Sequence, residues 1–304
     1  MKRLFNQLFL VSLLGVFAFS SCKKDKNDPD PTNTIVDIVV ASPDFTILEA
    51  AILRVPGLAT TLSGGSLTVF APTDAAFAAA GLDLAAINAF DVDDLEAILT
   101  YHVLGSIVGS TDVPASGAVP TVNGAQLYVS NNTNGVFANG IGVTTADVLA
   151  DNGVIHIITS DVLIPPTQTI AEILSANPDY SLLVTAVVTA GLLDAVSNPG
   201  NLTVFSPDND AFTAVGFGTP ESITAGGSTV FNPIVSNHVL TTNVFASDLT
   251  NGLTVENLGS NNLVISLPPA AVKLEGSSNA PSNITGANIV ATNGVIHYID
   301  AVIL

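Results

Sequence analysis

The sequence predicts an α+β fold that occurs twice in tandem. A long internal repeat covers most of the chain, and in each copy segments with helical spacing precede segments rich in β-branched residues. Helices followed by strands are typical of α+β domains, whereas regular alternation would favour a parallel α/β sheet. Hydrophobic residues make up 48% of the chain and charged residues 11%, so it can bury a sizeable core and extensive disorder is excluded.

The repeat consists of matched segments that recur in the same order. Thr34 corresponds to Thr169 and Thr68 to Thr203, an offset of 135 in both cases, and the later matches drift to 141 through small insertions in the second copy. The matched segments are 34–38 with 169–173, 42–45 with 177–180, 68–77 with 203–212, 101–104 with 237–240, and 152–156 with 293–297. This period is too long for a solenoid, so it predicts two domains, with their junction at Pro165-Pro166.

The first part of each copy is predicted to be helical. Apolar residues recur at helical spacing over 34–40 and 46–55, and Ser42-Pro43-Asp44 separates the two segments. A third apolar stripe predicts a helix over 91–104.

A buried strand and a capped helix are predicted between these helices. Residues 67–70 form a short apolar run with β-branched members, which is typical of a buried strand. Pro72 then turns the chain into a helix that Thr73 or Asp74 can cap. The corresponding residues of the second copy are Pro207, Asp208 and Asn209.

The last part of each copy is predicted to form strands. It is rich in Thr, Val, Gly and Asn with near alternation, and Asn152-Gly153 and Asn293-Gly294 are typical of a type I′ hairpin turn. The strand after each turn is apolar on both faces, as in residues 154–158, so it should be central in its sheet.

Charge and cysteine content exclude several classes of function. Asp and Glu number 26 against 7 Lys and Arg, a formal net charge of −19, and only Arg54 and Lys273 are basic beyond residue 26. Such an acidic body cannot neutralise phosphates, so nucleic acid is excluded as a main partner. The single cysteine, Cys22, excludes an intrachain disulfide and a cysteine-based zinc site.

The N-terminus predicts export and lipid anchoring. Lys2 and Arg3 precede an apolar stretch at 8–19, which has the proportions of a signal peptide and is too short to span a membrane comfortably. Ser20-Ser21-Cys22 resembles the lipobox of bacterial lipoproteins, in the form common in Bacteroidota, and implies cleavage before Cys22 and its acylation. The alternative is a free thiol in a secreted protein. Residues 1–21 are thus predicted as signal peptide, 22–33 as lipidated cysteine and flexible tether, and 34–166 and 167–304 as the two domains.

The repeated motifs resemble the fasciclin domain family. Each copy carries Thr-Val-Phe-(Ala/Ser)-Pro, then a Tyr-His or Asn-His dipeptide, then Asn-Gly-Val-Ile-His, in that order and at similar spacing. The resemblance covers 34–164 and 169–304. It implies that each domain is a compact β-sheet wedge or sandwich flanked by helices, and that the protein is a surface protein for adhesion or for binding matrix or polysaccharide, without enzymatic activity.

All four histidines lie at positions matched between the copies, which favours a per-domain role over one composite active site. His156 and His297 lie in the central strands, where we expect burial and hydrogen bonds to the backbone. For Tyr101 and His102 the resemblance implies an adhesion contact, while structural packing is the favoured alternative. In the second copy the dipeptide is Asn237-His238, in which asparagine replaces the tyrosine and its phenol ring is absent.

Metal and catalytic signatures are weak in the sequence. No two histidines have i, i+4 spacing, no calcium-loop pattern follows Asp91 or Asp208, and no Gly-x-Ser-x-Gly occurs. Charge at helix N-termini explains both acidic segments, with calcium binding as the alternative. We therefore expect no cofactor, no metal and no catalytic residue.

The sequence thus predicts a lipid-anchored adhesion or binding protein at the outer membrane or cell surface of a Gram-negative bacterium, on either face of that membrane. Its partners would be the membrane, through Cys22, and a polysaccharide or a matrix protein. Two alternatives are an accessory component of an envelope or nutrient-uptake complex, and a hydrolase with an unrecognised site.

Overall fold

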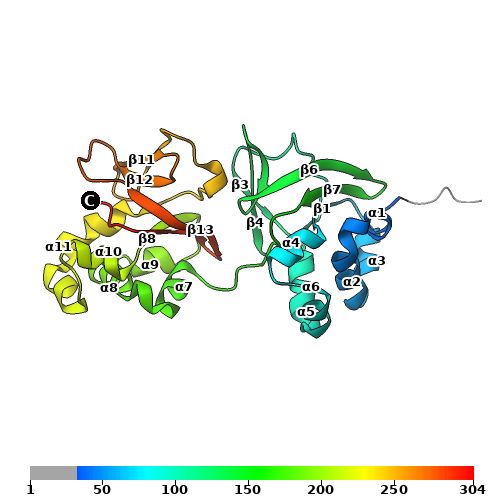
Figure 1. Cartoon of the computed structure of the whole chain (residues 1–304), viewed down its shortest axis with the longest axis horizontal. Helices are drawn as coiled ribbons and strands as arrows, with labels where there is room; N and C mark the ends of the chain where they lie inside the picture. The colour runs from blue at the N-terminus through cyan, green and yellow to red at the C-terminus, as the bar shows by residue number, and fades with distance from the viewer. Residues whose placement is uncertain (1–32) are drawn as a thin grey trace, which may run out of the picture. The chain divides into compact units, whose positions relative to one another are not determined.

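Each half of the chain folds its own seven-stranded sheet, with helices gathered on one side of it (Figure 1). The computed structural model describes residues 33–304, which form one contiguous unit. The predicted signal peptide, Cys22 and all but the last residue of the tether lie outside the described residues.

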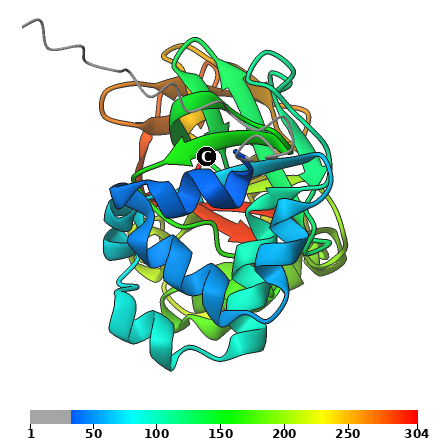
Figure 2. The same cartoon turned by 90° about the vertical axis from the view of Figure 1, so that its right-hand side faces the viewer.

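The first domain contains six α-helices and seven strands. The helices are α1 (Ile35–Ala41), α2 (Thr46–Arg54), α3 (Leu58–Ser63), α4 (Asp74–Ala79), α5 (Leu84–Ala89) and α6 (Val92–Tyr101). The strands are β1 (Leu67–Pro72), β2 (Val103–Leu104), β3 (Gly117–Pro120), β4 (Gln126–Asn132), β5 (Gly135–Ala138), β6 (Ile141–Ala150) and β7 (Gly153–Ile158). They lie in the order β2-β1-β7-β6-β5-β4-β3. In Figure 2 the helices of this domain, blue to cyan, again lie together beside its strands.

The second domain repeats the sheet with fewer helices. Its helices are α7 (Ile170–Ala176), α8 (Ser181–Ala190), α9 (Leu193–Ser197), α10 (Asn209–Ala214) and α11 (Pro220–Asn237). Its strands are β8 (Leu202–Pro207), β9 (Val239–Leu240), β10 (Thr254–Glu256), β11 (Asn262–Ser266), β12 (Ala271–Leu274), β13 (Ser282–Ala291) and β14 (Gly294–Ile299). The sheet order, β10-β11-β12-β13-β14-β8-β9, matches that of the first domain. The α+β prediction is confirmed.

Each sheet bends until its two edges meet, so that each domain has two cores. The amide of Val122, just after β3, donates to the carbonyl of Val103 in β2 at 2.8 Å. On one face of the paired strands β1 and β7, Val69 packs in the core formed with the helices. On the other face, Phe70 packs in a core enclosed by the bent sheet. A central strand that serves both cores must be apolar on both faces, as the sequence predicted.

The helix predicted over 91–104 ends earlier than expected. Helix α6 stops at Tyr101, His102 is its C-cap, and Val103–Leu104 forms strand β2. Val103 pairs with Val69 of β1, so two apolar residues that fit the helical stripe are instead taken by the sheet edge. Tertiary pairing has overridden the local helical pattern.

The predicted hairpins form, but their turns differ from the type I′ prediction. Ala150 pairs with Gly153, so the two loop residues are Asp151 and Asn152, and Asn152 does not have a positive φ. The Asn152 side chain instead accepts a hydrogen bond from the amide of Ile35 at 2.9 Å and donates to the carbonyl of Leu62 at 2.7 Å. Asn293 holds α7 in the same way, through the amide of Ile170. These asparagines tie the first helix of each domain to the hairpin.

The glycine after each asparagine is required by close packing between strands. A Cβ on Gly153 would lie 2.0 Å from the carbonyl oxygen of Leu67, and one on Gly294 would lie 2.1 Å from that of Leu202. The parallel pairings β1–β7 and β8–β14 begin at these contacts. The Asn-Gly repeat is thus explained by a side-chain cap and a close backbone approach.

The two residues that follow strands β1 and β8 have different roles: the first caps the next helix, and the second joins that helix to an earlier one. Thr73 is the N-cap of α4, while Asp74 accepts a hydrogen bond from the amide of Ile47 at 2.8 Å and so joins α4 to the start of α2. In the second domain Asp208 is the N-cap, and Asn209 accepts from the amide of Leu182 at 3.0 Å. Pro72 and Pro207 end strands β1 and β8.

Within residues 33–304, no helix combines the length and hydrophobicity needed to cross a bilayer.

Candidate functional site

The histidine that follows α6 is buried and holds the end of its domain. His102 Nδ1 lies 2.8 Å from the carbonyl oxygen of Ile98, and the amide of Leu163, 61 residues further along the chain, donates to Nε2 at 3.0 Å. His238 repeats both contacts, with the carbonyl of Ile234 at 2.8 Å and the amide of Ile303 at 2.9 Å. Each ring therefore joins a helix end to the last segment of its domain.

These contacts require a neutral ring. Because Nε2 accepts an amide proton, it carries no proton itself, and Nδ1–H donates to the helix carbonyl. Burial lowers the pKa of both His102 and His238 from 6.5 to about 4, because a charged ring would lose its hydration. A small cavity beside His102 is lined by side chains that include Val39, Ile52 and Phe70. His102 is the one titratable residue in this lining.

The residue before each of these histidines is buried as well. Tyr101 Oη donates to the carbonyl of Gln126 at 2.9 Å and accepts from the side-chain amide of Asn139 at 2.9 Å. Burial raises the pKa of Tyr101 to about 12. Asn237 accepts hydrogen bonds from Asn257 and Asn261. Since Tyr101, His102, Asn237 and His238 are all buried, the structure gives these four residues the packing role and offers none of them to a surface partner.

The second histidine pair holds a bulge in the long strand of each sheet. His156 Nε2 lies 2.9 Å from the carbonyl oxygen of Val108, and Nδ1 lies 3.3 Å from the amide of Asp147. Asp147 has a φ of 59° and lies where the β6–β7 register shifts. His297 makes the matching contacts with the carbonyl of Val244 and the amide of Asn288, whose φ is 63°. Both rings are buried and bonded to backbone, as the sequence predicted.

The acidic segments serve as helix caps. Asp91 accepts from the amides of Asp93 and Asp94 at the start of α6, and Asp208 caps α10. In the described part of the chain, no three Asp, Glu, His or Cys side chains converge as a metal site would require. All four histidines of residues 33–304 are hydrogen-bonded to backbone groups.

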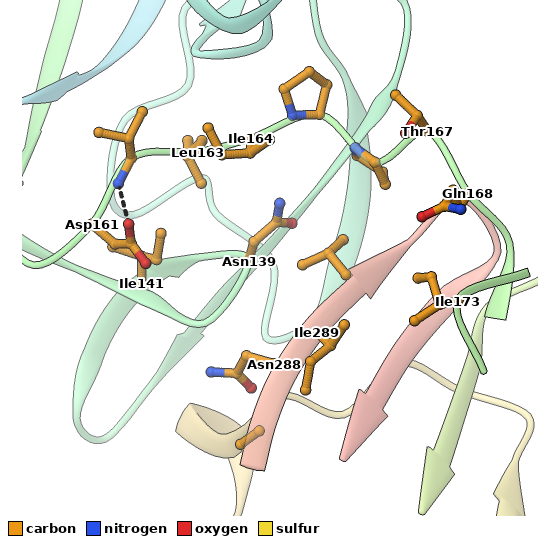
Figure 3. Close-up of a pocket in the computed structure, with 15 residues that line it drawn as sticks. Asn139, Ile141, Asp161, Leu163, Ile164, Thr167, Gln168, Ile173, Asn288 and Ile289 are labelled. Carbon is orange, nitrogen blue, oxygen red and sulfur yellow. Dashed lines mark hydrogen bonds between the residues drawn. The ribbon is translucent and has the colours of Figure 1, made fainter. Parts of the chain in front are cut away.

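A cleft of about 610 Å³ lies between the linker and the two sheets (Figure 3). Its walls are aliphatic, from Ile141, Ile164, Ile173 and Ile289. Its polar groups come mainly from the linker, and the Asp161 carboxylate at one end already accepts the amide of Val162 at 2.8 Å. The full lining is Asn139, Ile141, 161–168, Ile173 and 287–290.

The polar groups of the cleft differ in availability. Asn139 is used internally, because its amide group bonds to Tyr101 and to the amide of Tyr128. Thr167 and Gln168 are exposed and lie along the linker (Figure 3). Sequence reasoning missed this cleft because its lining comes from three separate parts of the chain, and only Pro165-Pro166 pointed to it.

The chain belongs to the fasciclin domain family. The family model matches twice, over residues 43–165 and 178–304, so it covers both domains. The predicted recognition and the tandem arrangement are confirmed.

Individual relatives agree with this assignment. The chain is 27% identical to human periostin over 266 residues, covering 87% of this chain and 30% of that protein. It is 36% identical over 113 residues to the cell surface glycolipoprotein MPB83 of Mycobacterium bovis, covering 36% of this chain and 49% of that protein. The chain spans about a third of the length of the first curated relatives it matches.

A solved structure of a FAS1 domain pair from the insect cell adhesion molecule fasciclin I also matches. It is 21% identical, with a TM-score of 0.43, and the match covers 85% of this chain and 95% of that one.

The buried histidines predict a specific pH dependence. Between pH 6.5 and about 4 the unfolded chain binds protons at His102 and His238 that the folded chain does not, so stability falls as the pH falls through this window. The expected loss is roughly 3 kcal/mol for each histidine, and it levels off below pH 4. Urea unfolding followed from pH 7.5 to 3.5 measures it.

The control for this prediction is His102→Gln, which cannot be protonated and should flatten the pH dependence for the first domain. Nuclear magnetic resonance titration of the ring protons gives a direct check. A folded-state midpoint near pH 6.5 for His102 or His238 would contradict the assignment.

Proposed function

We propose that this protein is a non-catalytic adhesion or binding protein, anchored by lipid at the outer membrane or surface of a Gram-negative bacterium, and that it binds extracellular polysaccharide. The observation that carries the proposal is the internal use of the reactive side chains. Each of the four histidines is bonded to backbone on both ring nitrogens. The groups that line the accessible cleft are neutral except for the Asp161 carboxylate at one end. Such a surface can recognise a ligand, and its lining offers no second acid or base beside the Asp161 carboxylate.

The chemistry of the cleft favours an uncharged, hydroxyl-rich ligand. The hydroxyl of Thr167 and the amide of Gln168 can donate and accept hydrogen bonds, beside aliphatic walls suited to the apolar faces of sugar rings. The acidic body opposes the approach of polyanions. A neutral polysaccharide fits both conditions better than an acidic one.

The surface location has support from the sequence and from relatives. Cys22 follows an export segment and small residues, and several acyl chains on one residue would hold a protein stably at a membrane. Among the relatives, MPB83 is named as a cell surface glycolipoprotein. Membership of the fasciclin family supports a non-enzymatic role at the level of the family.

Filling the cleft tests where the ligand binds. Thr167→Trp places a large ring among the linker residues and should reduce retention on neutral glycans of an array by at least about tenfold, the effect of losing about 1.4 kcal/mol of binding. Thr250→Trp is the matched control, because Thr250 is also exposed but lies outside the cleft lining, and it should bind like wild type.

Two outcomes would count against the proposal. Unchanged glycan binding by Thr167→Trp would remove the cleft from the binding site. No retention of wild-type protein on any glycan, together with hydrolysis of a chromogenic glycoside or ester, would replace the binding function with a catalytic one.

Replacement of the cysteine tests the anchor. In cells fed a labelled fatty acid, wild-type protein should carry label and fractionate with membranes, and Cys22→Ser should lose both because the acylated thiol is absent. Cys22→Ser protein that remains with the membrane fraction to the same extent would contradict lipid anchoring.

A further inference from the structure

The contact between the two domains joins two different kinds of surface. The first domain supplies the outer face of β4, where Tyr128 packs against Phe245 with ring centroids 5.8 Å apart. Ser130 of the same face donates to Asp248 at 2.7 Å. We call the outer face of the β4–β5 hairpin the hairpin face, and the partner segment 243–248 with Asn288 the loop surface.

Each domain carries both surfaces, because the repeat extends to them. Thr68 accepts the amide of Val108 at 2.8 Å, and Thr203 accepts that of Val244 at the same distance, so residue 108 corresponds to 244. On this correspondence the loop surface of the first domain is 107–112 with Asp147. The inward residues Leu127 and Leu263 correspond in the strands, so the hairpin face of the second domain contains Val264 and Ser266 of β11.

The chain uses only one hairpin face and one loop surface. In the second domain Asn243 and Phe245 are buried, whereas in the first domain their counterpart Ile107 is 58% exposed and their counterpart Gly109 is half-buried. Beside Ile107 lies a mainly apolar groove of about 360 Å³, lined in part by Val108 and Val119. An exposed apolar surface of this kind marks an interaction site.

The two unused surfaces are complementary in chemistry. Val264 takes the place of Tyr128, and Ile107 that of Asn243, so both of these places are aliphatic in the unused surfaces. Gly109 takes the place of Phe245, so the aromatic contact is not repeated. Ser266 and Asp112 are retained in the places of Ser130 and Asp248, so their hydrogen bond can form again. The presence of this serine–aspartate pair on the two unused surfaces is the first observation that favours their docking on each other.

Opposite charge on the two unused surfaces is the second observation that favours their docking. Lys273 is one of two basic residues among 33–304, and it pairs with Val264 across β11 and β12, which places it on the same hairpin face. On the loop surface of the first domain, Asp147 is exposed, and hydrogen bonds from Ser110 lower the pKa of its carboxyl. In this acidic chain, a lysine opposite Asp112 and Asp147 favours contact where other surfaces repel.

We propose that the protein associates with a second copy of itself head to tail, the hairpin face of the second domain of one copy docking on the loop surface of the first domain of the next. The contact repeats the arrangement already present within the chain. Because the two surfaces are different and lie on different domains, the association is heterologous and adds one copy after another, into a ring where the rotation closes and into an open chain where it does not.

The test uses two variants that each remove one surface. Ile107→Asp adds a negative charge to the loop surface, and Val264→Asp adds one to the hairpin face. Each variant keeps the other surface intact. Leu53→Asp is the matched control, because Leu53 is 67% exposed on α2 and belongs to neither surface.

Sedimentation velocity on the purified full chain, in one fixed detergent buffer and over about 10 µM to 1 mM, gives the readout. Wild type and Leu53→Asp should grow in size with concentration, and Ile107→Asp and Val264→Asp should each stay monomeric. An equimolar mixture of the two variants should form dimers and nothing larger, because only one productive pair of surfaces remains.

Three results would overturn the proposal: monomeric wild type at every concentration, association of Ile107→Asp equal to that of wild type, or a mixture that stays monomeric. Circular dichroism shows whether each variant is folded. If Val264→Asp is not, Lys273→Glu tests the same face and should give the same monomer and the same mixed dimer.

Discussion

A neutral histidine ring, buried between a helix end and the last segment of the domain, is the interaction on which each domain depends. It joins residues 61 apart in the first domain and 65 apart in the second, through one donated and one accepted hydrogen bond. An unpaired polar group at such a buried position would be costly, so the helix end, the ring and the final segment must be ordered together. The bent sheet, whose edges meet close to this ring, closes around it.

The internal use of polar groups separates architecture from recognition. Histidine, tyrosine and asparagine side chains that looked functional in the sequence hold backbone in place, and the two copies share most of these contacts. The copies differ inside at Tyr101, which corresponds to Asn237. They differ also on their surfaces, where Tyr128 corresponds to Val264 and Phe245 to Gly109. Duplication thus preserved the buried histidine contacts and left the outer faces free to acquire separate partners, one of them the neighbouring domain.

Much of the fold could be predicted from the sequence, because the repeat, the apolar spacing of α1 and α2 and the two-sided strand β7 are local patterns. The end of α6 could not be predicted from the sequence, since Val103 fits the helical spacing of apolar residues and only its pairing with Val69 places it in the sheet. The sequence predicts only a turn at Asn152. Its hydrogen bond with the amide of Ile35 joins residues 117 apart, so no local pattern indicates it. The burial of His156 was predictable from its strand, whereas the cleft, built from the linker and both sheets, left no contiguous signal.

Native-state hydrogen exchange measures the closure of each domain at the two amides that donate hydrogen bonds to the histidine rings. If the histidines hold the domains closed, Leu163 and Ile303 should exchange only upon global unfolding of their domains at neutral pH, as slowly as the amides of β7 and β14. Exchange of either amide at the rate of exposed loops, with the central strands still protected, would show that the last segment is free and that the account is wrong.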